Sequence, residues 1–188
     1  MARRVGLPPA FCGLEQQRVY APGNLAIPHE WQGRGRWRGG PLHTFVDDYR
    51  QEFFWRRPEE GALIARAAGI VTAPDFTAYL DDPQQWRTYQ AWRSATVAKY
   101  WQSFGVAVLP VVSFRSGCAY HVERDSVWSI RAPRPENRQQ WEEEVTKWAE
   151  EAEPLALVVF GRRWECFLPV PLVWRSLASK VTAAQKEV

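Results

Sequence analysis

The stretch that decides the fold is residues 81–113, DDPQQWRTYQAWRSATVAKYWQSFGVAVLPVVS. Its large apolar side chains recur at steps of three and four residues, which predicts a helix that Asp81 and Asp82 cap and Gly105 ends. The apolar run VAVL follows this glycine at once, as expected for a buried strand. A helix joined this closely to a buried strand is typical of α/β proteins with a parallel sheet.

The same alternation extends along the chain in both directions. Buried strands that end in polar or charged residues are predicted at 44–48, 70–75, 106–113, 127–131 and 155–162. Helical patterns occupy 57–68, 83–104 and 135–152, and 177–188 is expected to be a terminal helix. We therefore predict one α/β domain over residues 1–188, with an irregular segment at 1–43 and an α/β core at 44–176. The strands would form a mostly parallel five-stranded sheet or a partial (β/α) barrel with covering helices.

Composition and cysteine content narrow the class of protein. The 188 residues carry a net charge of +3, and 46% of them are hydrophobic, which is enough for a core. Cys12, Cys118 and Cys166 are widely separated, which argues against a zinc site, an iron–sulfur cluster and a disulfide framework. The sequence has no secretory apolar region and no run long enough to cross a bilayer, so we expect a cytoplasmic protein without a membrane partner.

Motifs for nucleotide cofactors and established catalytic sites are absent from the sequence. It contains no GxxxxGK[ST] loop, no GxGxxG after a strand and no GxSxG elbow. The three histidines, His29, His43 and His121, lack the spacing of metal ligands. These absences leave open whether the protein is an enzyme.

Acidic residues follow the first two predicted strands. Asp47 and Asp48 come directly after one strand, and Asp75 follows the next. Neighbouring parallel strands end about 5 Å apart, so we expect these three carboxylates to converge as catalytic residues. Asp47 and Asp75 would then be ligands of Mg²⁺. The alternative is that the carboxylates cap helices and turns.

Basic and polar residues are expected to hold an anionic substrate near the same edge. The candidate substrate-binding residues are Arg50, Arg93, Gln102 and Ser113, while Arg131 and Arg162 follow later strands. A separate basic stretch, Arg34, Arg36, Trp37 and Arg38, interleaves arginine with an aromatic ring and is a candidate nucleic-acid-binding segment or a solvated loop. The helix aromatics Trp86, Tyr89, Trp92 and Trp101 are expected to form a core stripe rather than a base-stacking surface.

Three ordered motifs resemble the domain-of-unknown-function 4417 family. They are Asp47-Asp48-Tyr49-Arg50 with Glu52, Trp55 and Arg57-Pro58-Glu59; Pro74-Asp75-Phe76 with Tyr79, Asp81 and Pro83; and Tyr100-Trp101-Gln102 with Gly105, Leu109-Pro110 and Ser113. Phe114 departs from the pattern, because the family tends to have tryptophan there. The resemblance implies that Asp47, Asp48, Arg50, Asp75 and Gln102 belong to the defining pattern of a family without established activity. Its members occur in bacteria, archaea, phages and mobile elements.

Three functions remain open on this basis. The first is a phage or mobile-element protein with an anion- or phosphate-binding crevice at the strand ends, acting in nucleic-acid metabolism and using Mg²⁺ if it is an enzyme. The second is a non-catalytic factor that binds a host or phage protein through its aromatic-rich surface. The third is a binder of a nucleotide or another small molecule.

Overall fold

The computed structural model describes residues 29–31, 33, 39–79, 81–112, 126–175 and 177 of the chain. Strands and helices alternate along them, so the predicted α/β class is confirmed. Nearly all of the terminal helix expected at 177–188 lies outside the described residues. None of the described helices is long and apolar enough to span a membrane.

The strands form two parallel sheets, so the prediction of one five-stranded sheet is wrong. The first sheet contains, in order, β1 (His29–Glu30), β2 (Leu42–His43), β3 (Ile70–Thr72) and β4 (Ala107–Leu109). The second contains β5 (Val127–Arg131), β6 (Ala156–Phe160) and β7 (Leu172–Arg175). A parallel bridge between Val111 and Ser129 joins the two sheets, so neighbouring strands follow chain order from β1 to β7.

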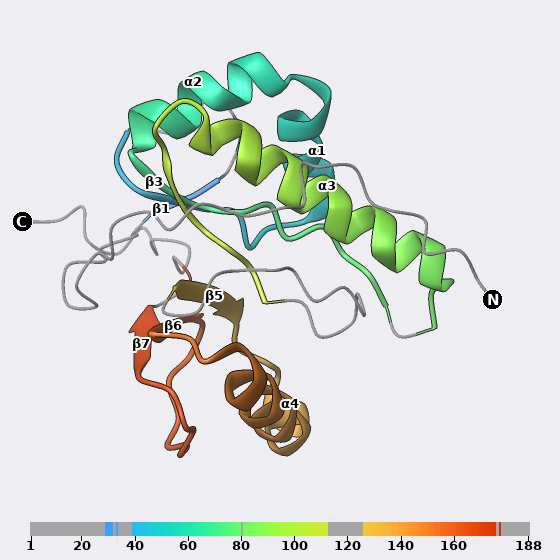
Figure 1. Ribbon diagram of the computed structural model, residues 1–188, viewed down its shortest axis with the longest axis vertical. Coiled ribbons are helices and arrows are strands. Elements are labelled where there is room, and N and C mark those ends of the chain that lie inside the picture. Colours follow the sequence, from blue (N-terminus) through green and yellow to red (C-terminus); the bar gives the residue numbers. More distant parts are fainter. Residues whose placement is uncertain are drawn as a thin grey trace, which may run out of the picture.

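Helices cover the outer sides of these sheets (Figure 1). The first three, α1 (Asp48–Arg56), α2 (Pro58–Ala68) and α3 (Gln84–Gln102), lie over the four-stranded sheet. The fourth, α4 (Arg138–Ala152), follows a 3-10 turn at Pro135–Asn137 and packs on the three-stranded sheet. Its buried residues are Trp141, Val145 and Ala149.

The two sheets face each other across a shared apolar core. His43 on β2 and Phe45 just after it pack on Phe160 of β6, with ring centroids 5.1 and 4.9 Å away. Three strands separate β2 from β6, and a flat layer would place these two strands about 19 Å apart. The strand layer is therefore strongly curved, and its helices lie on the outside of the curve.

The start of α2 follows from its local sequence, whereas the start of α3 differs from the prediction. Pro58 occupies the first turn of α2 together with Glu59 and Glu60, where a missing N–H and negative charge are both favourable. At the start of α3 the predicted cap is wrong, because Pro83 is the N-cap residue and no side chain caps the helix. Asp82 instead accepts a hydrogen bond of 2.7 Å from the backbone N–H of Tyr79, which closes the turn before the helix.

The aromatic core stripe expected on α3 is also largely wrong. The buried face consists mainly of Ala91, Ala95 and Ala98, and Trp101 is its one fully buried ring among the described residues. Trp86 and Tyr89 are 43% and 40% exposed. Small side chains let α3 approach the sheet and the other helices closely, which leaves the rings of its first half at the surface.

Candidate anion-binding site

Asp48 joins the start of α1 to the segment that follows β3. Its carboxylate accepts hydrogen bonds from the Thr77 hydroxyl at 2.9 Å and from the Thr77 backbone N–H at 3.2 Å to each oxygen. Asp48 also lies in the first turn of α1, where a negative charge is favoured by the helix dipole. Its oxygens are therefore engaged in a contact between two elements of the scaffold.

Gln51 forms a second link at the same junction, and sequence reasoning missed it. This side chain is completely buried. Its Nε2 donates to the carbonyls of Val46 and Asp75, both at 2.9 Å, and its Oε1 accepts from the backbone N–H of Asp75 at 2.6 Å. Its position inside the first motif, between Arg50 and Glu52, was the only available signal. The amide fixes the backbone of Asp75 relative to α1.

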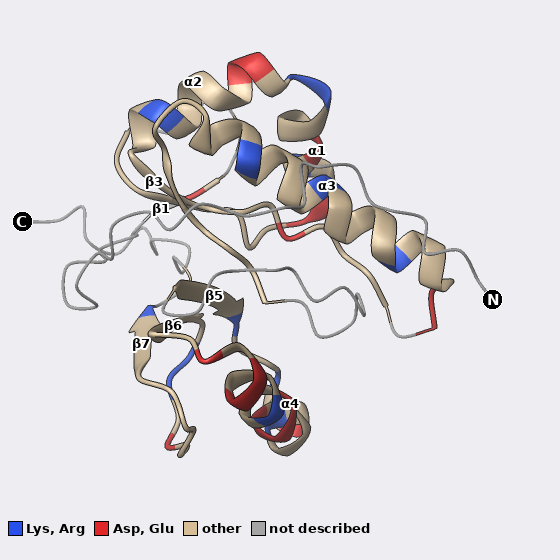
Figure 2. Ribbon diagram, in the orientation of Figure 1, with Lys and Arg blue, Asp and Glu red and all other residues tan. Residues whose placement is uncertain are grey.

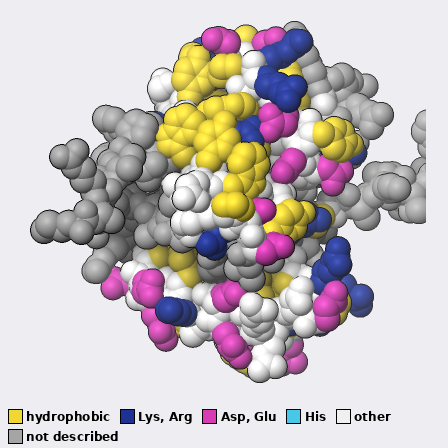
Figure 3. Space-filling view, turned by 90° about the vertical axis from the view of Figure 1, so that its right-hand side faces the viewer, with side chains coloured by type: hydrophobic (Ala, Val, Ile, Leu, Met, Phe, Trp, Pro, Cys, Tyr) yellow, Lys and Arg dark blue, Asp and Glu magenta, His cyan; other side chains and the backbone are white. Residues whose placement is uncertain are grey.

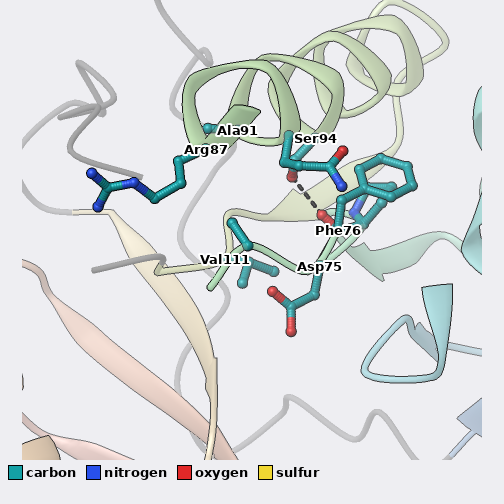
Figure 4. A pocket seen from close by; sticks show the side chains of 9 residues that line it. Asp75, Phe76, Arg87, Ala91, Ser94 and Val111 are labelled. Carbon is teal, nitrogen blue, oxygen red and sulfur yellow. Dashed lines mark hydrogen bonds between the residues drawn. The ribbon is translucent and has the colours of Figure 1, made fainter. Parts of the chain in front are cut away.

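The other two candidate carboxylates lie on either side of this junction. Asp47 precedes α1 as its N-cap residue, is exposed and makes no side-chain cap hydrogen bond. Asp75 is half-buried, and Figure 4 shows its carboxylate pointing away from α3. No group of three or more His, Cys, Asp or Glu side chains in the described part of the chain is arranged to hold a metal ion.

Arg50 and Arg93, the two candidate phosphate ligands, both have partners within the protein. Arg50 contacts Glu30 at 3.3 Å, and its Nε donates to the Tyr49 hydroxyl at 2.9 Å. The hydrogen bond to Tyr49 raises the pKa of the Arg50 guanidinium above its usual value. Arg93 is 4% exposed and forms an ion pair with Glu52.

A cage of rings surrounds the guanidinium of Arg93. Its Cζ lies 3.9 Å from the ring centroid of Phe76, 5.1 Å from that of Trp55 and 5.8 Å from that of Tyr89. Gln90 accepts a further hydrogen bond from it at 2.9 Å. Arginine stacks well on aromatic faces because its guanidinium is planar and weakly hydrated. Arg93 thereby ties α3 to α1 and to the segment after β3.

The remaining candidate residues are not brought to this junction. Gln102 lies in the last turn of α3, shortly before β4 begins, and hence at the amino end of the sheet. Ser113 lies outside the described residues. The same is true of the basic stretch, which comprises Arg34, Arg36, Trp37 and Arg38.

Basic residues end the strands of the second sheet. Arg131, the last residue of β5, and Arg175, the last residue of β7, are both in register with Phe160 of β6. Register partners in a parallel sheet point to the same face, and the Phe160 ring points into the core between the sheets. Arg131 and Arg175 therefore flank Phe160 at the carboxyl edge of the inner face. Figure 2 shows basic segments, in blue, at the ends of β5 and β7. Arg162 follows two residues beyond Phe160.

A shallow pocket lies at the carboxyl ends of β3 and β4. It is partly open to solvent. Its walls come from the segment after β3, from one side of α3 and from the chain after β4: Pro74, Asp75, Phe76, Ala78, Arg87, Gln90, Ala91, Ser94 and Val111. Figure 4 shows the hydrogen bond of 2.5 Å from the Ser94 hydroxyl to the Pro74 carbonyl, which closes one wall.

The family model of the domain of unknown function DUF4417 matches residues 14–167 of the chain. The chain belongs to the DUF4417 family. Gene 1 protein of Mycobacterium phage D29 is 39% identical over 94 residues, 49% of this chain and 35% of that protein. Gene 1 protein of Mycobacterium phage L5 is 38% identical over 72 residues, 38% of this chain and 31% of that protein. Each match thus spans about a third of the phage relative, and no solved structure matches the chain.

Several motif residues that carry the DUF4417 resemblance share one structural role. Asp48, Glu52 and the Pro74–Phe76 segment connect α1, α3 and the chain after β3. The basic edge is different, because Arg131 and Arg175 belong to the second sheet, and Arg175 lies beyond the matched residues. Sequence reasoning placed Arg131 and Arg162 at the edge and missed Arg175, whose only signal was an apolar run ending in arginine.

Proposed function

We propose that this protein binds phosphate groups of nucleic acid at the carboxyl edge of its curved strand layer, in a role in phage nucleic-acid metabolism. The observation that carries the proposal is the placement of Arg131 and Arg175 in register on both sides of Phe160. Two guanidinium groups at one rim form a site for an anion, and arginine binds phosphate with two parallel hydrogen bonds. The phage relatives supply the biological setting.

The location of these arginines supports the proposal further. Seven parallel strands in chain order, curved so that β2 faces β6, have the layout of a partial (β/α) barrel. Barrels of this kind bind ligands at the carboxyl ends of their strands. Arg131 is exposed, and among the described residues it has no carboxylate partner. Its charge is therefore accessible to a ligand.

The proposal also includes metal-dependent catalysis at the carboxyl ends of the first sheet, away from Arg131 and Arg175. Asp47 and Asp75 are the proposed Mg²⁺ ligands, and Asp48 would act beside them. Asp47→Asn tests this version, because the residue is exposed and its loss has little effect on packing. A phosphate-cleaving activity that requires Mg²⁺ and disappears in this variant would support catalysis, whereas an unchanged rate would contradict it.

The binding proposal is tested with fluorescently labelled oligonucleotides and anisotropy titrations at several salt concentrations. Arg131→Ala and Arg175→Ala should each weaken binding and reduce the slope of log K against log salt concentration by about 1 for each phosphate that the variant no longer binds. Arg66→Ala is the matched control, since it removes an exposed arginine from the last turn of α2, far along the chain from this edge. Equal affinities and slopes for all three variants would refute the site.

A second candidate function, binding to a host or phage protein, has its own observation. Phe167 is 89% exposed, in the loop between β6 and β7. The loop is anchored close by, because Trp164 packs between Trp141 and Trp174 and donates a hydrogen bond of 2.7 Å to Glu142. An exposed ring on an anchored loop resembles the hot spots of protein interfaces. This function would be favoured by a protein partner that stays bound after nuclease treatment and is lost in Phe167→Ala.

A further inference from the structure

Aromatic rings of α3 and α1 form a cluster that reaches the surface, with Trp55 of α1 packed against the core. Tyr89 lies at its centre, with ring centroids 5.7 Å from Trp86, 5.9 Å from Trp92 and 6.4 Å from Trp55 of α1. We call these four residues the aromatic face. Trp86 and Tyr89 are 43% and 40% exposed, while Trp55 and Trp92 are half-buried beneath them. Figure 3 shows a broad apolar patch on the side of the molecule where α3 begins.

The aromatic face is held in a fixed arrangement. The Tyr89 and Trp92 rings are stacked with an interplanar angle of 23°, and Trp55 meets Trp92 edge to face at 5.4 Å. Arg93 anchors the cluster from below through its contacts with Trp55 and Tyr89. Rings that are already ordered lose little conformational entropy when a ligand stacks on them, so this face is preorganised for binding.

An exposed arginine lies beside these rings. A single carboxylate, Glu52, pairs with both Arg93 and Arg56, and Arg56 keeps 76% of its side chain exposed. These two guanidinium groups outnumber the one carboxylate between them. This local excess of positive charge suits a polyanion whose phosphates lie beside the rings.

We infer that the aromatic face is a stacking platform for the unpaired bases of single-stranded nucleic acid, with Arg56 beside its phosphate backbone. The inference rests on the proposed nucleic-acid binding and specifies which form of nucleic acid is bound. Base–aromatic stacking is available only to bases whose flat faces are exposed, and those faces are covered in a duplex. The platform should therefore discriminate between single strands and duplexes without reading the sequence of bases.

The experiment compares a labelled oligothymidylate with a duplex of the same length, using the full chain. Trp86→Leu keeps an apolar side chain of moderate size but removes the π-face, and Trp86→Phe restores a smaller ring. Trp86 is the substitution of choice because Tyr89 is its only ring contact among those described. Phe104→Leu is the matched control, since this ring is equally exposed at the opposite end of α3.

We expect Trp86→Leu to weaken binding of the single strand by about 5- to 150-fold, the range for loss of one base–aromatic stack. Duplex binding should change less, Trp86→Phe should recover most of the affinity, and Phe104→Leu should behave as the unchanged protein. Two results separate this inference from the function on which it rests. If Arg131→Ala weakens binding and Trp86→Leu does not, the platform is refuted while the phosphate site stands. If Trp86→Leu instead dissociates a dimer of the protein without changing oligonucleotide binding, the aromatic face is a protein interface and the inference is refuted.

Discussion

Replacing Gln51 by leucine should destabilise the protein, because this buried side chain binds three backbone groups near the strand ends. Leucine has a similar size, so the substitution leaves packing almost unchanged. It removes the two hydrogen bonds to the Val46 and Asp75 carbonyls and the one from the Asp75 N–H. Three backbone groups then lose their partner in an environment where water has limited access.

The expected loss follows from these three groups. A buried polar group that loses its partner costs roughly 1–3 kcal/mol, and the partial burial of these hydrogen bonds favours the lower end of that range. The free energy of unfolding should therefore fall by about 3 kcal/mol. For a chain of this length such a loss lowers the melting temperature by roughly 6–12 °C. Gln140→Leu, whose amide contacts Glu144 on the exposed side of α4, is the control and should change the free energy by less than about 0.5 kcal/mol.

Urea unfolding followed by circular dichroism measures the difference in the free energy of unfolding. Gln51→Glu tests whether the lost hydrogen bonds cause that difference. A carboxylate here keeps the acceptor for the Asp75 N–H but faces two carbonyls and Asp48, so folding should raise its pKa. An acid whose folded pKa is raised stabilises the fold at low pH and loses that contribution as pH rises through the folded pKa. The loss in the free energy of unfolding caused by Gln51→Glu should therefore be smaller at pH 5 than at pH 8. A loss below 1 kcal/mol in the free energy of unfolding for Gln51→Leu would refute this role of the Gln51 hydrogen bonds.

Three further predictions concern the scaffold and its one described cysteine. Glu52→Gln should destabilise by about 3–5 kcal/mol, because it leaves the buried guanidinium of Arg93 without its carboxylate, and chemical denaturation would measure this. Gly161→Ala should destabilise because φ is +150° and the new Cβ would clash with Ala132, and adding Ala132→Gly should restore part of the melting temperature. Burial raises the pKa of the Cys166 thiol, so alkylation at pH 8 followed by mass spectrometry should be slower than for a free cysteine.

The parts of the fold that could be predicted from sequence are those with long apolar patterns. The strand at 70–72, the long helix that ends before Gly105 and the strand at 156–160 all have patterns that local physics explains. β1 and β2 have two residues each and carry no periodic pattern, because their pairing is set by neighbouring strands rather than by their own composition. β7 is half-buried, and its apolar run before Arg175 is too short to predict a strand by itself.

The candidate site was predicted less well, for a reason that follows from its contacts. The sequence indicated that residues near Asp48 and Asp75 lie at neighbouring strand ends, and the structure places the two segments together. It gave no sign that Thr77 and Gln51 would bind them, since these contacts join residues 29 and 24 positions apart. Hydrogen bonds over such separations depend on the curvature of the sheet, which local patterns do not encode.

The same contacts decide where a ligand is expected. Asp48 and Arg93 are held by hydrogen bonds and rings within the protein, so a ligand that recruited them would first have to break those interactions. Each such exchange of a buried polar group costs on the order of 1–3 kcal/mol before any binding energy is gained. Arg131 faces no such cost among the described residues, because its charge has no carboxylate partner there. Binding is therefore expected at the basic rim of the second sheet, while these family motifs hold the first sheet and its helices in the geometry that forms the edge.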